Sequence, residues 1–572
     1  MRCNNFFIKR KANLCSSNIH SAQKIFFFSL PFFEYFSPAF MNIFPIPSST
    51  NAISPQEQLL TRYLFFFVLA VCLLVSGARL SSSDENAIFL LTESIVTRGA
   101  LDIPANIIGN GSMFEGKFYI WAEIGEALLA IPFYIAGKLI TSVLPLSENL
   151  RLLALKAIVS TMNAFFGAML AVVLYRSLRK FSATVRTAMF LSLTLCFGTF
   201  MFPYLKTIMR DVQLALLLLG SVYCLYEFRQ SLRIRWLVFA GICAAFGVLN
   251  KMVFALNIPF LAAYLILIAG KENVSRLKST FYFSLPFLGT LLIMAAYNYL
   301  RFNNFLESGY HGGTSFPTPL FVGVFGLLLS PGKGLFFFAP ITILLLWSAK
   351  LFFKKFREEA LLLYALIIAN VLLYAKYVAW GGDGSWGPRY LVAILPLLIV
   401  PLGIFLDAAT QSVKRIAFLL AVIGVLVQCG GVSIYFGNYL RSIGEYPYTK
   451  QFEDAEFMER SHFNPAFSPI TGHWAMLVRN AEEHLSGNIP QLIPQEATST
   501  QRIPLAEKDQ QQLLHTFDYW FTYGMYAGFS RIVLLSAFAL GSVAVSILFF
   551  IMYRLMKHVH SDALLSMEGR SV

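Results

Sequence analysis

Long apolar segments recur along this chain of 572 residues, and they constrain its fold more than any other feature of the sequence. A helix of roughly 20 apolar residues crosses the ~30 Å hydrocarbon core of a bilayer. The chain offers about a dozen such stretches, among them YLFFFVLAVCLLVS at 63–76. A large soluble protein would bury one helix of this kind, not about a dozen. We therefore expect an all-α polytopic membrane protein with about 12–13 transmembrane helices.

The composition agrees with a surface that faces lipid. Charged residues make up 13% of the chain and hydrophobic residues 57%, with a mean hydropathy of +0.62, whereas soluble domains carry about 25% charged residues. In a soluble protein the net charge of +14 would suggest a nucleic-acid partner. Here the basic residues gather in short connections between apolar segments, so they report topology and we expect no nucleic acid.

The distribution of Lys and Arg sets the orientation of the spans. Short connections on one side carry sixteen basic residues, and those on the other side carry seven. Because basic connections stay in the cytoplasm, the N-terminus is expected inside. The three large outer regions are then 80–120, 299–334 and 435–530. The spans are expected at 61–79, 152–175, 187–204, 212–228, 236–250, 253–269, 280–298, 334–349, 359–378, 389–408, 416–434 and 531–554.

Two segments do not fit this alternation. Residues 121–143 are apolar enough to span, but a crossing there reverses the charge bias of every later connection. A re-entrant or interface-lying segment interrupted by Pro132 would restore the alternation, and both interpretations stay open. Residues 319–330 are too short to span alone. The expected regions are an N-terminal tail at 1–60, a multi-helix transmembrane region at 61–434, a small external domain at 435–530, and a last helix with a cytoplasmic tail at 531–572. Met41 is an alternative start of the protein.

Cysteine and histidine spacing gives no metal site. Five of the seven cysteines lie inside apolar segments, and no CxxC pair occurs. The outer histidines His311, His462 and His473 are isolated in sequence, and each is interpreted as a structural or hydrogen-bonding group.

Four polar motifs fall on the expected outer side. The first is SSSDE at 81–85, directly after the first span, where Asp84 and Glu85 form a carboxylate pair. Such a pair can act as a general base or bind a cation. It can also cap a helix at 85–97, opened by Ser83 or Asp84, and capping is the commoner role. Both interpretations can hold at once.

The second motif, YLKTIMRD at 204–211, places three charges between two apolar helices. Lys206 and Arg210 are either solvated residues that reach the interface or cations offered to a phosphate, with Asp211 at the mouth of a cavity. The two interpretations are equally supported by the residues alone.

The third motif is SPGKGL at 330–335, preceded by GYHGG with His311. Glycines let a backbone approach an anion, and Lys333 supplies charge on a face poor in lysine. The spacing is not that of a phosphate-binding GxxxxGK[ST] loop. The alternative is a simple turn that enters the next helix.

The fourth motif, WGGDGSWGPRY at 380–390, is the most distinctive stretch of the chain. Trp380 and Trp386 are each typical of membrane-interface anchors. Three glycines, Asp383 and Arg389 packed between and beside them favour a site in which aromatic rings stack on a sugar and the guanidinium binds phosphate oxygens.

Together these motifs resemble the GT-C class of polytopic glycosyltransferases, specifically bacterial phospholipid-carrier-dependent enzymes related to protein mannosyltransferases and to the aminoarabinose transferase of lipid A. Asp84, with Glu85, matches the acid that follows the first helix in that class, and Asp211 matches a second acid in a later outer loop. The runs SPGKGLFFFAP, AWGGDGSWGPRYL and FNPAFSPITGHW look like stretches common in one subgroup. The resemblance covers roughly residues 60–475.

The resemblance implies a membrane enzyme that moves a sugar from a polyprenyl-phosphate donor to a glycan, lipid or protein acceptor. The reaction would take place at the outer face of a bacterial inner membrane, with inversion. Asp84 would be the base beside Glu85. The substrate-binding set that it implies is Lys206, Arg210, Asp211, His311, Lys333, Trp380, Asp383, Trp386 and Arg389. The acids form no DxD pair, so no cofactor is indicated, although a divalent cation stays open.

Three other functions compete with this interpretation. A polymerase or ligase of surface polysaccharides would share the location but use a diphosphate-linked glycan. A transporter or flippase would usually show polar residues at mid-membrane and repeated halves, whereas here the polar groups collect at one face without a repeat. A non-catalytic scaffold would not need lysines beside glycines on the outer face.

Overall fold

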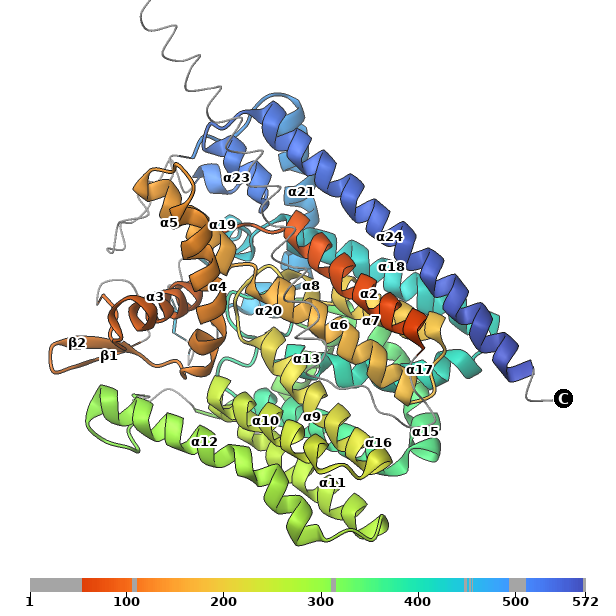
Figure 1. Cartoon of the computed structure of the whole chain (residues 1–572). Helices are drawn as coiled ribbons and strands as arrows, with labels where there is room; N and C mark the ends of the chain where they lie inside the picture. The colour runs from red at the N-terminus through yellow and green to blue at the C-terminus, as the bar shows by residue number, and fades with distance from the viewer. Residues whose placement is uncertain are drawn as a thin grey trace, which may run out of the picture.

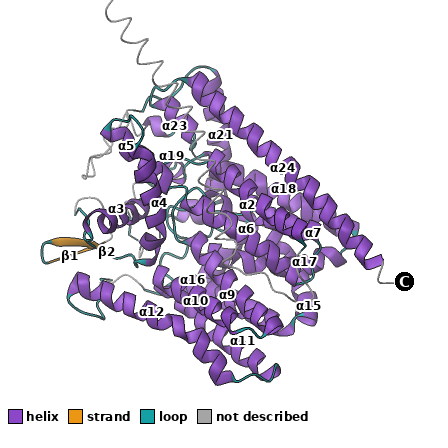
Figure 2. Cartoon of the chain, viewed as in Figure 1, coloured by secondary structure: helices purple, strands orange, loops and turns teal. Residues whose placement is uncertain are grey.

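The protein is described from a computed structural model over residues 54–104, 111–309, 315–446, 450–451, 454, 456–492 and 511–568, with side chains to residue 561. Long helices lie side by side in one bundle, and a smaller group of helices with a β-hairpin stands beside one end of it (Figures 1 and 2). The bundle helices are α2 (Pro55–Leu74), α6 (Met162–Lys180), α7 (Val185–Phe197), α8 (Met201–Tyr204), α9 (Asp211–Ser231), α10 (Ile234–Asn250), α11 (Ile258–Lys271), α12 (Arg276–Phe302), α13 (Leu320–Leu329), α14 (Leu335–Phe338), α15 (Leu345–Lys355), α16 (Arg357–Lys376), α17 (Leu395–Ala408), α18 (Gln411–Ser433) and α24 (Arg531–Glu568).

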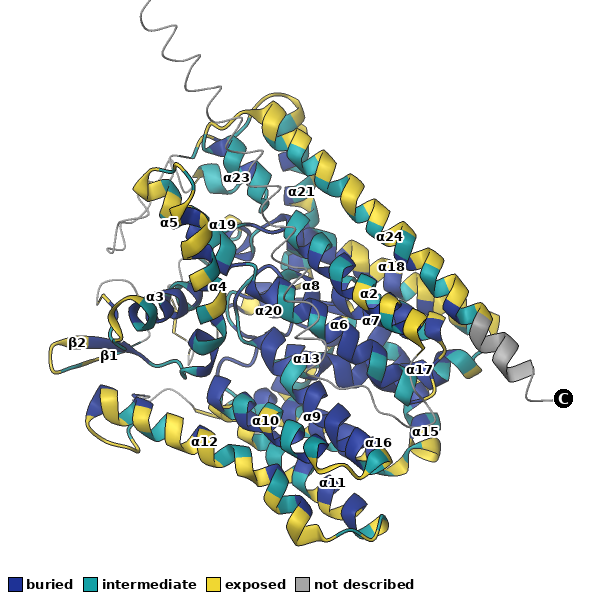
Figure 3. Cartoon of the chain, viewed as in Figure 1, coloured by how far each residue is buried: buried dark blue, intermediate teal, exposed yellow. Residues whose placement is uncertain are grey.

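The all-α polytopic class predicted from the sequence is confirmed. Among the described residues, nine helical stretches are long and apolar enough to cross a membrane, and each overlaps a predicted span. Three shorter apolar helices accompany them: Val185–Phe197, Ile234–Asn250 and Leu320–Leu329. The chain is therefore a multi-pass membrane protein. Helices α12 and α24 present mostly exposed apolar side chains, as a lipid-facing surface requires (Figure 3).

Two predicted spans have different bounds for local reasons. The first begins at Pro55, where the Ser54 side chain accepts a hydrogen bond from the Glu57 amide and proline occupies the first helical position. It ends at Leu74, so residues 75–79 of the predicted span lie in a loop. The predicted span 334–349 is broken into α14, the 3₁₀ helix η2 (Pro340–Leu344) and α15, because Pro340 cannot continue the hydrogen-bond ladder.

The smaller group contains α3 (Ser83–Arg98), α4 (Gly125–Ser142), α5 (Glu148–Val159) and the antiparallel pair β1 (Gly111–Phe114) and β2 (Lys117–Ile120). The hairpin, which the sequence did not predict, turns through Glu115 and Gly116, both at positive φ, as a two-residue turn of this kind requires. The group has its own apolar core, and Ile208 from the bundle inserts into it. Helix α4, the ambiguous 121–143 segment, is not among the nine candidate spans.

The region before α24 adds short helices at the same end of the bundle. They are α19 (Phe436–Ser442), α20 (Glu459–Phe463), the 3₁₀ helix η4 (Pro465–Phe467), α21 (Pro469–Leu485) and α23 (Trp520–Tyr526). Helix α21 packs on α18, and the Trp474 indole donates to the Leu426 carbonyl at 3.0 Å. Further 3₁₀ helices, η1 (Met252–Asn257) and η3 (Arg389–Ile394), precede α11 and α17. The four predicted polar motifs thus lie near connections at one end of the bundle.

Candidate active site

The connection between α8 and α9, residues 205–210, joins the bundle to the smaller group. The Ile208 amide donates to Glu85 Oε1 at 2.9 Å, and the Ile208 side chain is buried in the core of that group. Arg210 forms ion pairs with Glu123 at 2.5 Å and Glu126 at 3.1 Å, in the segment that enters α4. The connection is therefore fixed on both sides, and Asp211 follows it as the first residue of α9.

A chain of buried amides supports this connection from behind. Asn163 Nδ2 donates to the Met209 carbonyl at 2.7 Å, and its Oδ1 accepts from Gln213 Nε2 at 3.2 Å. Gln213 Oε1 in turn accepts from Asn250 Nδ2 at 2.8 Å. Because buried polar groups are costly to leave unpaired, these bonds hold the start of α9 and the end of α10 in register.

Acidic and basic side chains converge at the start of α9. Asp211 Oδ2 accepts from Arg389 Nε at 3.0 Å, and Asp211 is almost fully buried. Asp84 interacts electrostatically with Arg389, with Glu126 and with Asp383. The structure therefore brings together Asp84, Asp211 and Arg389, three residues predicted from separate motifs.

The electrostatics of this cluster are set by burial. Burial raises the pKa of Glu126 to about 8; Asp211 and Asp84 add to that rise, while Arg210 opposes it. Burial also raises the pKa of Asp383 to about 6, against the effects of Arg389 and Lys333. A site with two carboxyl groups that accept protons near neutral pH suits acid–base chemistry.

Lys251, between α10 and η1, is a cation that none of the four predicted motifs contains. Its Nζ lies 4.8 Å from the ring centroid of Tyr390 and 5.5 Å from that of Tyr374. Those two rings stack in parallel with centroids 4.5 Å apart. Burial lowers the pKa of Lys251 to about 8, although Asp211 opposes the change. Within the described residues the ammonium has no hydrogen bond or ion pair, so its charge is available to a ligand.

Glu85 is committed to structure. It forms a capping box with Ser82, and its Oε2 also accepts from the amide and hydroxyl of Ser81 at 2.7 Å each. The cap residue is Ser82, not the predicted Ser83 or Asp84, because only Ser82 stands three residues before Glu85. Glu85 is buried, whereas Asp84 is partly exposed on the same first turn.

Lys333 holds a loop instead of presenting its charge at the surface. Its buried ammonium donates to the backbone carbonyls of Asp383, at 3.0 Å, and Ser385. Burial lowers its pKa to about 7. Gly332 beside it donates to the His462 carbonyl at 3.1 Å, and a Cβ there would lie 1.7 Å from the Ser461 carbonyl oxygen. Only glycine fits this close approach.

The two predicted tryptophans pack inside the protein. Trp380 lies against His462, with ring centroids 5.2 Å apart, and Trp386 lies against His473 at 4.5 Å. The Trp386 indole donates to Gln428 at 2.9 Å. The runs 330–340, 379–391 and 463–474, distant in sequence, thus meet in one buried assembly. It shapes the loop that carries Asp383, whose Oδ1 is buried without a hydrogen bond from the described residues, and Arg389.

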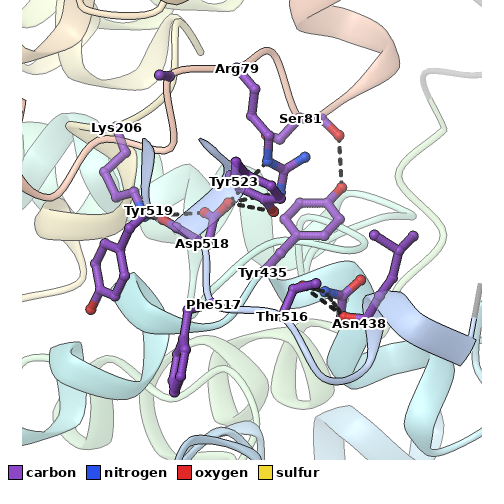
Figure 4. A network of polar contacts seen from close by, with 12 residues as sticks. Arg79, Ser81, Lys206, Tyr435, Asn438, Thr516, Phe517, Asp518, Tyr519 and Tyr523 are labelled. Atoms are coloured by element: carbon purple, nitrogen blue, oxygen red, sulfur yellow. Dashed lines mark hydrogen bonds and ion pairs between the residues drawn. The ribbon is translucent and has the colours of Figure 1, made fainter. Parts of the chain in front are cut away.

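Lys206 contacts a residue that no motif predicted. Its Nζ pairs with Asp518 Oδ2 at 3.1 Å and donates to the Val432 carbonyl at 2.7 Å (Figure 4). The remaining predicted residue, His311, lies outside the described residues. Within those residues, no group of three or more His, Cys, Asp or Glu side chains could hold a metal ion.

Comparison with known families identifies the chemistry. Residues 154–299 match the sequence model of a family described as dolichyl-phosphate-mannose-protein mannosyltransferase, and this stretch contains Lys206, Arg210, Asp211 and Lys251. The chain is a glycosyltransferase that uses a lipid-phosphate-sugar donor, and its residues 154–299 are similar to this family. The family resemblance expected from the motifs is thereby confirmed.

Solved structures of two other proteins are distantly similar to this chain. ArnT from Cupriavidus metallidurans in the apo state is 15% identical, with 85% of this chain and 77% of that chain covered and a TM-score of 0.45. The same protein bound to undecaprenyl phosphate is 14% identical, with 85% of this chain and 78% of that chain covered and a TM-score of 0.44. A third structure is archaeal oligosaccharyltransferase AglB from Archaeoglobus fulgidus, in complex with an inhibitory peptide and a dolichol-phosphate. It is 15% identical, with 84% of this chain and 56% of that chain covered and a TM-score of 0.27. No curated protein matches the chain.

Several residues of the candidate site lie outside the four predicted motifs. Glu123 and Glu126 lie in a segment interpreted only for its topology, and Lys251 follows the last residue of an apolar helix. An available signal was charge next to long apolar runs on the outer side. Asp518 carried no such signal, since it lies in an aromatic stretch, TFDYWFTY at 516–523, outside the four motifs.

Proposed function

We propose that the glycosyltransferase moves a sugar from its polyprenyl-phosphate donor to an acceptor hydroxyl at the outer face of a bacterial inner membrane, with inversion. The acceptor belongs to a glycan, a lipid or a protein. The observation that carries this proposal is the convergence of Asp84, Asp211 and Arg389 at the start of α9. It joins a partly exposed carboxylate to a guanidinium that is oriented by a second carboxylate.

Asp84 is the proposed base. It accepts the proton of the acceptor hydroxyl while that oxygen forms a bond to the anomeric carbon. The bond between the anomeric carbon and the phosphate oxygen breaks on the opposite side, which inverts the carbon. The electron pair leaves with the polyprenyl phosphate, so stabilising the phosphate lowers the barrier.

Arg389, Lys251 and Arg210 are the proposed partners of the leaving phosphate. Asp211 binds Nε of Arg389, and neither Nη atom has a protein hydrogen bond within the described residues. A guanidinium held in this way matches two phosphate oxygens. Lys251 adds a second cation next to Asp211, and Arg210, which pairs with Glu123, adds a third.

Lys333, Trp380 and Trp386 take a different part from the one the motifs suggested. Their contacts are internal, so we propose that they shape the loop that positions Asp383 and Arg389. Lys206 and Glu85 likewise position their loops. Asp383, with its unpartnered buried oxygen, stays in the proposed substrate-binding set.

The basic connections support an outward-facing site. Helix α9 begins at Asp211 and ends at Ser231, 21 residues later, next to Arg229 and its partners Glu358 and Glu359. A helix of that length spans about 30 Å. The Lys- and Arg-rich connections therefore lie at the far end of the bundle from the site, and such connections stay in the cytoplasm.

Transfer from defined donors tests the reaction. Purified full-length protein is incubated with radiolabelled polyprenyl-phosphate sugars and a membrane extract of acceptors, and the anomeric configuration of the product is determined. Labelled, inverted product supports the proposal. Transfer only from a diphosphate-linked glycan, or product with retained configuration, would contradict it.

Cysteine labelling in intact bacterial cells tests the face. Glu483→Cys should react with a membrane-impermeant maleimide, and Lys354→Cys should react only after the cells are opened. The reverse pattern would place the site inside.

A further inference from the structure

The last polar segment before α24 carries a carboxylate that contacts both loops leading to the candidate acids (Figure 4). Asp518 Oδ1 accepts from Arg79 Nε at 3.0 Å and Nη2 at 2.9 Å, while Oδ2 pairs with Lys206 Nζ at 3.1 Å. Arg79 stands five residues before Asp84, and Lys206 stands five residues before Asp211. One side chain therefore connects the two loops whose ends meet in the site.

Asp518 is itself held in place from several sides. Its amide donates to the Ser433 carbonyl at 2.8 Å, and the Tyr523 hydroxyl donates to its Oδ1 at 3.1 Å. Next to it, the Trp520 amide donates to the Ser76 carbonyl at 2.7 Å. The carboxylate is thus presented by a segment that pairs with the end of α18 and with the loop after α2.

The Arg79 guanidinium lies between two aromatic rings, as Figure 4 shows. Its Cζ is 4.7 Å from the Tyr435 ring centroid and 4.9 Å from that of Tyr523. The Tyr435 hydroxyl also donates to the Ser81 carbonyl at 2.9 Å, one turn before Asp84. A cation between two ring faces gains from both of them, so this contact adds to the ion pair with Asp518.

The charges make Asp518 the necessary partner of both cations. Burial alone would raise its pKa, but Lys206 and Arg79 outweigh burial and hold the pKa of Asp518 well below its usual range. The carboxylate is therefore ionised at every working pH. Without it, the buried Lys206 and the partly exposed Arg79 would face one another with no counter-charge, which is unfavourable.

We propose that Asp518 is a positioning residue that clamps loops 75–82 and 205–210 together, so that Asp84 and Asp211 act on the same ligand. The clamp rests on the proposed function of those two acids. The bond from the Ile208 amide to Glu85 joins the same loops closer to the site. Asp518 acts through the loops and does not touch the substrate.

Amide hydrogen exchange on the full-length protein measures how firmly the two loops are held, and it does not depend on enzyme activity. Asp518→Asn should speed amide exchange in peptides that cover 76–86 and 204–211. Lys206→Met should loosen 204–211 alone, because the Arg79 pair remains. The matched control is Glu483→Gln, which removes a carboxylate paired with His515 at 2.7 Å in the same outer region but away from both loops. It should change neither peptide.

Sugar-transfer kinetics measure how the loosened loops affect catalysis. Asp518→Asn should lower kcat about tenfold or more, because misplacement of reacting groups costs rate. The donor KM should change less than kcat, because Arg389 and Lys251 lie outside both loops. The double variant Lys206→Met/Asp518→Asn should be no slower than Asp518→Asn, because both changes open one clamp.

Exchange unchanged in both loops of Asp518→Asn would overturn the clamp, and so would multiplicative losses in the double variant. Loosened loops with kcat unchanged would also overturn it. Loosened loops together with full transfer by Asp84→Asn would instead refute the proposed function and leave the contact between the loops intact. If Asp518→Asn does not accumulate, Lys206→Met carries the test through its single loosened peptide.

Discussion

Asp211 and Arg389 are separated by 178 positions in the chain, yet Oδ2 of one accepts a hydrogen bond from Nε of the other at 3.0 Å. Each is the first residue of its helix, so the bond joins the starts of α9 and η3. Because the pair uses Nε, the two Nη groups of Arg389 remain for a ligand. The geometry fits a guanidinium prepared for a phosphate.

Replacing Arg389 by lysine tests this geometry while the charge is kept. Arg389→Lys should lower kcat/KM for the donor roughly 10- to 100-fold, since the planar fork is lost. Steady-state transfer kinetics measure the effect. Arg460→Lys, on helix α20, is the matched control and should leave the transfer kinetics unchanged. Equal activity of both variants would mean that Arg389 supplies only charge.

The pH dependence of transfer should show an upper limb near pH 8. Below that value the Lys251 ammonium, whose pKa burial lowers to about 8, is charged and can attract the donor phosphate. Above it the ammonium loses its proton, while Glu126, whose pKa burial raises to about 8, becomes an anion. Both changes make the site more negative, so kcat/KM for the donor should fall.

Three variants separate these groups. Lys251→Arg stays charged and should carry activity to higher pH, whereas Lys251→Met should lose most activity below pH 8 and differ less from the wild type above it. Glu126→Gln should make the fall shallower. An upper limb that is identical in wild type and Lys251→Arg would show that Lys251 does not titrate with activity.

Lys333→Met distinguishes a loop-holding lysine from a phosphate ligand. The buried ammonium makes two hydrogen bonds to backbone carbonyls, and each bond to a charged group contributes about 1.5–3 kcal/mol. We expect a melting temperature lowered by several degrees and a lower kcat, with the donor KM little changed. A raised KM with an unchanged melting temperature would restore the role that the sequence suggested.

Gly332→Ala tests the close approach of the 330–334 turn to α20. The added Cβ would lie 1.7 Å from the Ser461 carbonyl oxygen, so the turn must shift. The free energy of unfolding should fall by about 1–3 kcal/mol, as for other overpacked interiors. Gly289→Ala is the control, because a Cβ at that position meets nothing within 4 Å. Thermal melting in detergent would measure both, and similar melting temperatures would contradict the packing described.

The spans could be predicted because the signal for a membrane helix is local. An apolar run such as α18 can be recognised from the hydropathy of its own residues, and each of the nine long spans was predicted in this way. Their ends were harder to place, since Ser54 and Pro55 start α2 through a capping bond that leaves no mark in hydropathy. The β-hairpin was missed because its strands have only four residues each.

The site was predicted only in part, for a reason that Lys206 and Lys333 illustrate. A lysine in a polar loop looks the same whether it faces a ligand or is bound by its own protein. Lys206 is bound by Asp518, 312 positions away, and Lys333 by carbonyls 50 and 52 positions away. Asp518 and Lys251 were missed for the same reason, since their importance comes from distant partners that only the fold assembles.

Sugar transfer by the Asp84→Asn variant tests the central claim most directly. Asp102→Asn, a carboxylate between α3 and β1 that is paired with Arg98 at 3.1 Å, is the control. With a polyprenyl-phosphate donor, Asp84→Asn should lose at least about 100-fold in kcat at unchanged expression and melting temperature, because the proton acceptor is gone, and Asp102→Asn should remain active. Transfer that survives in Asp84→Asn would contradict the account and leave Asp84 as an acidic residue of the first turn of α3 alone.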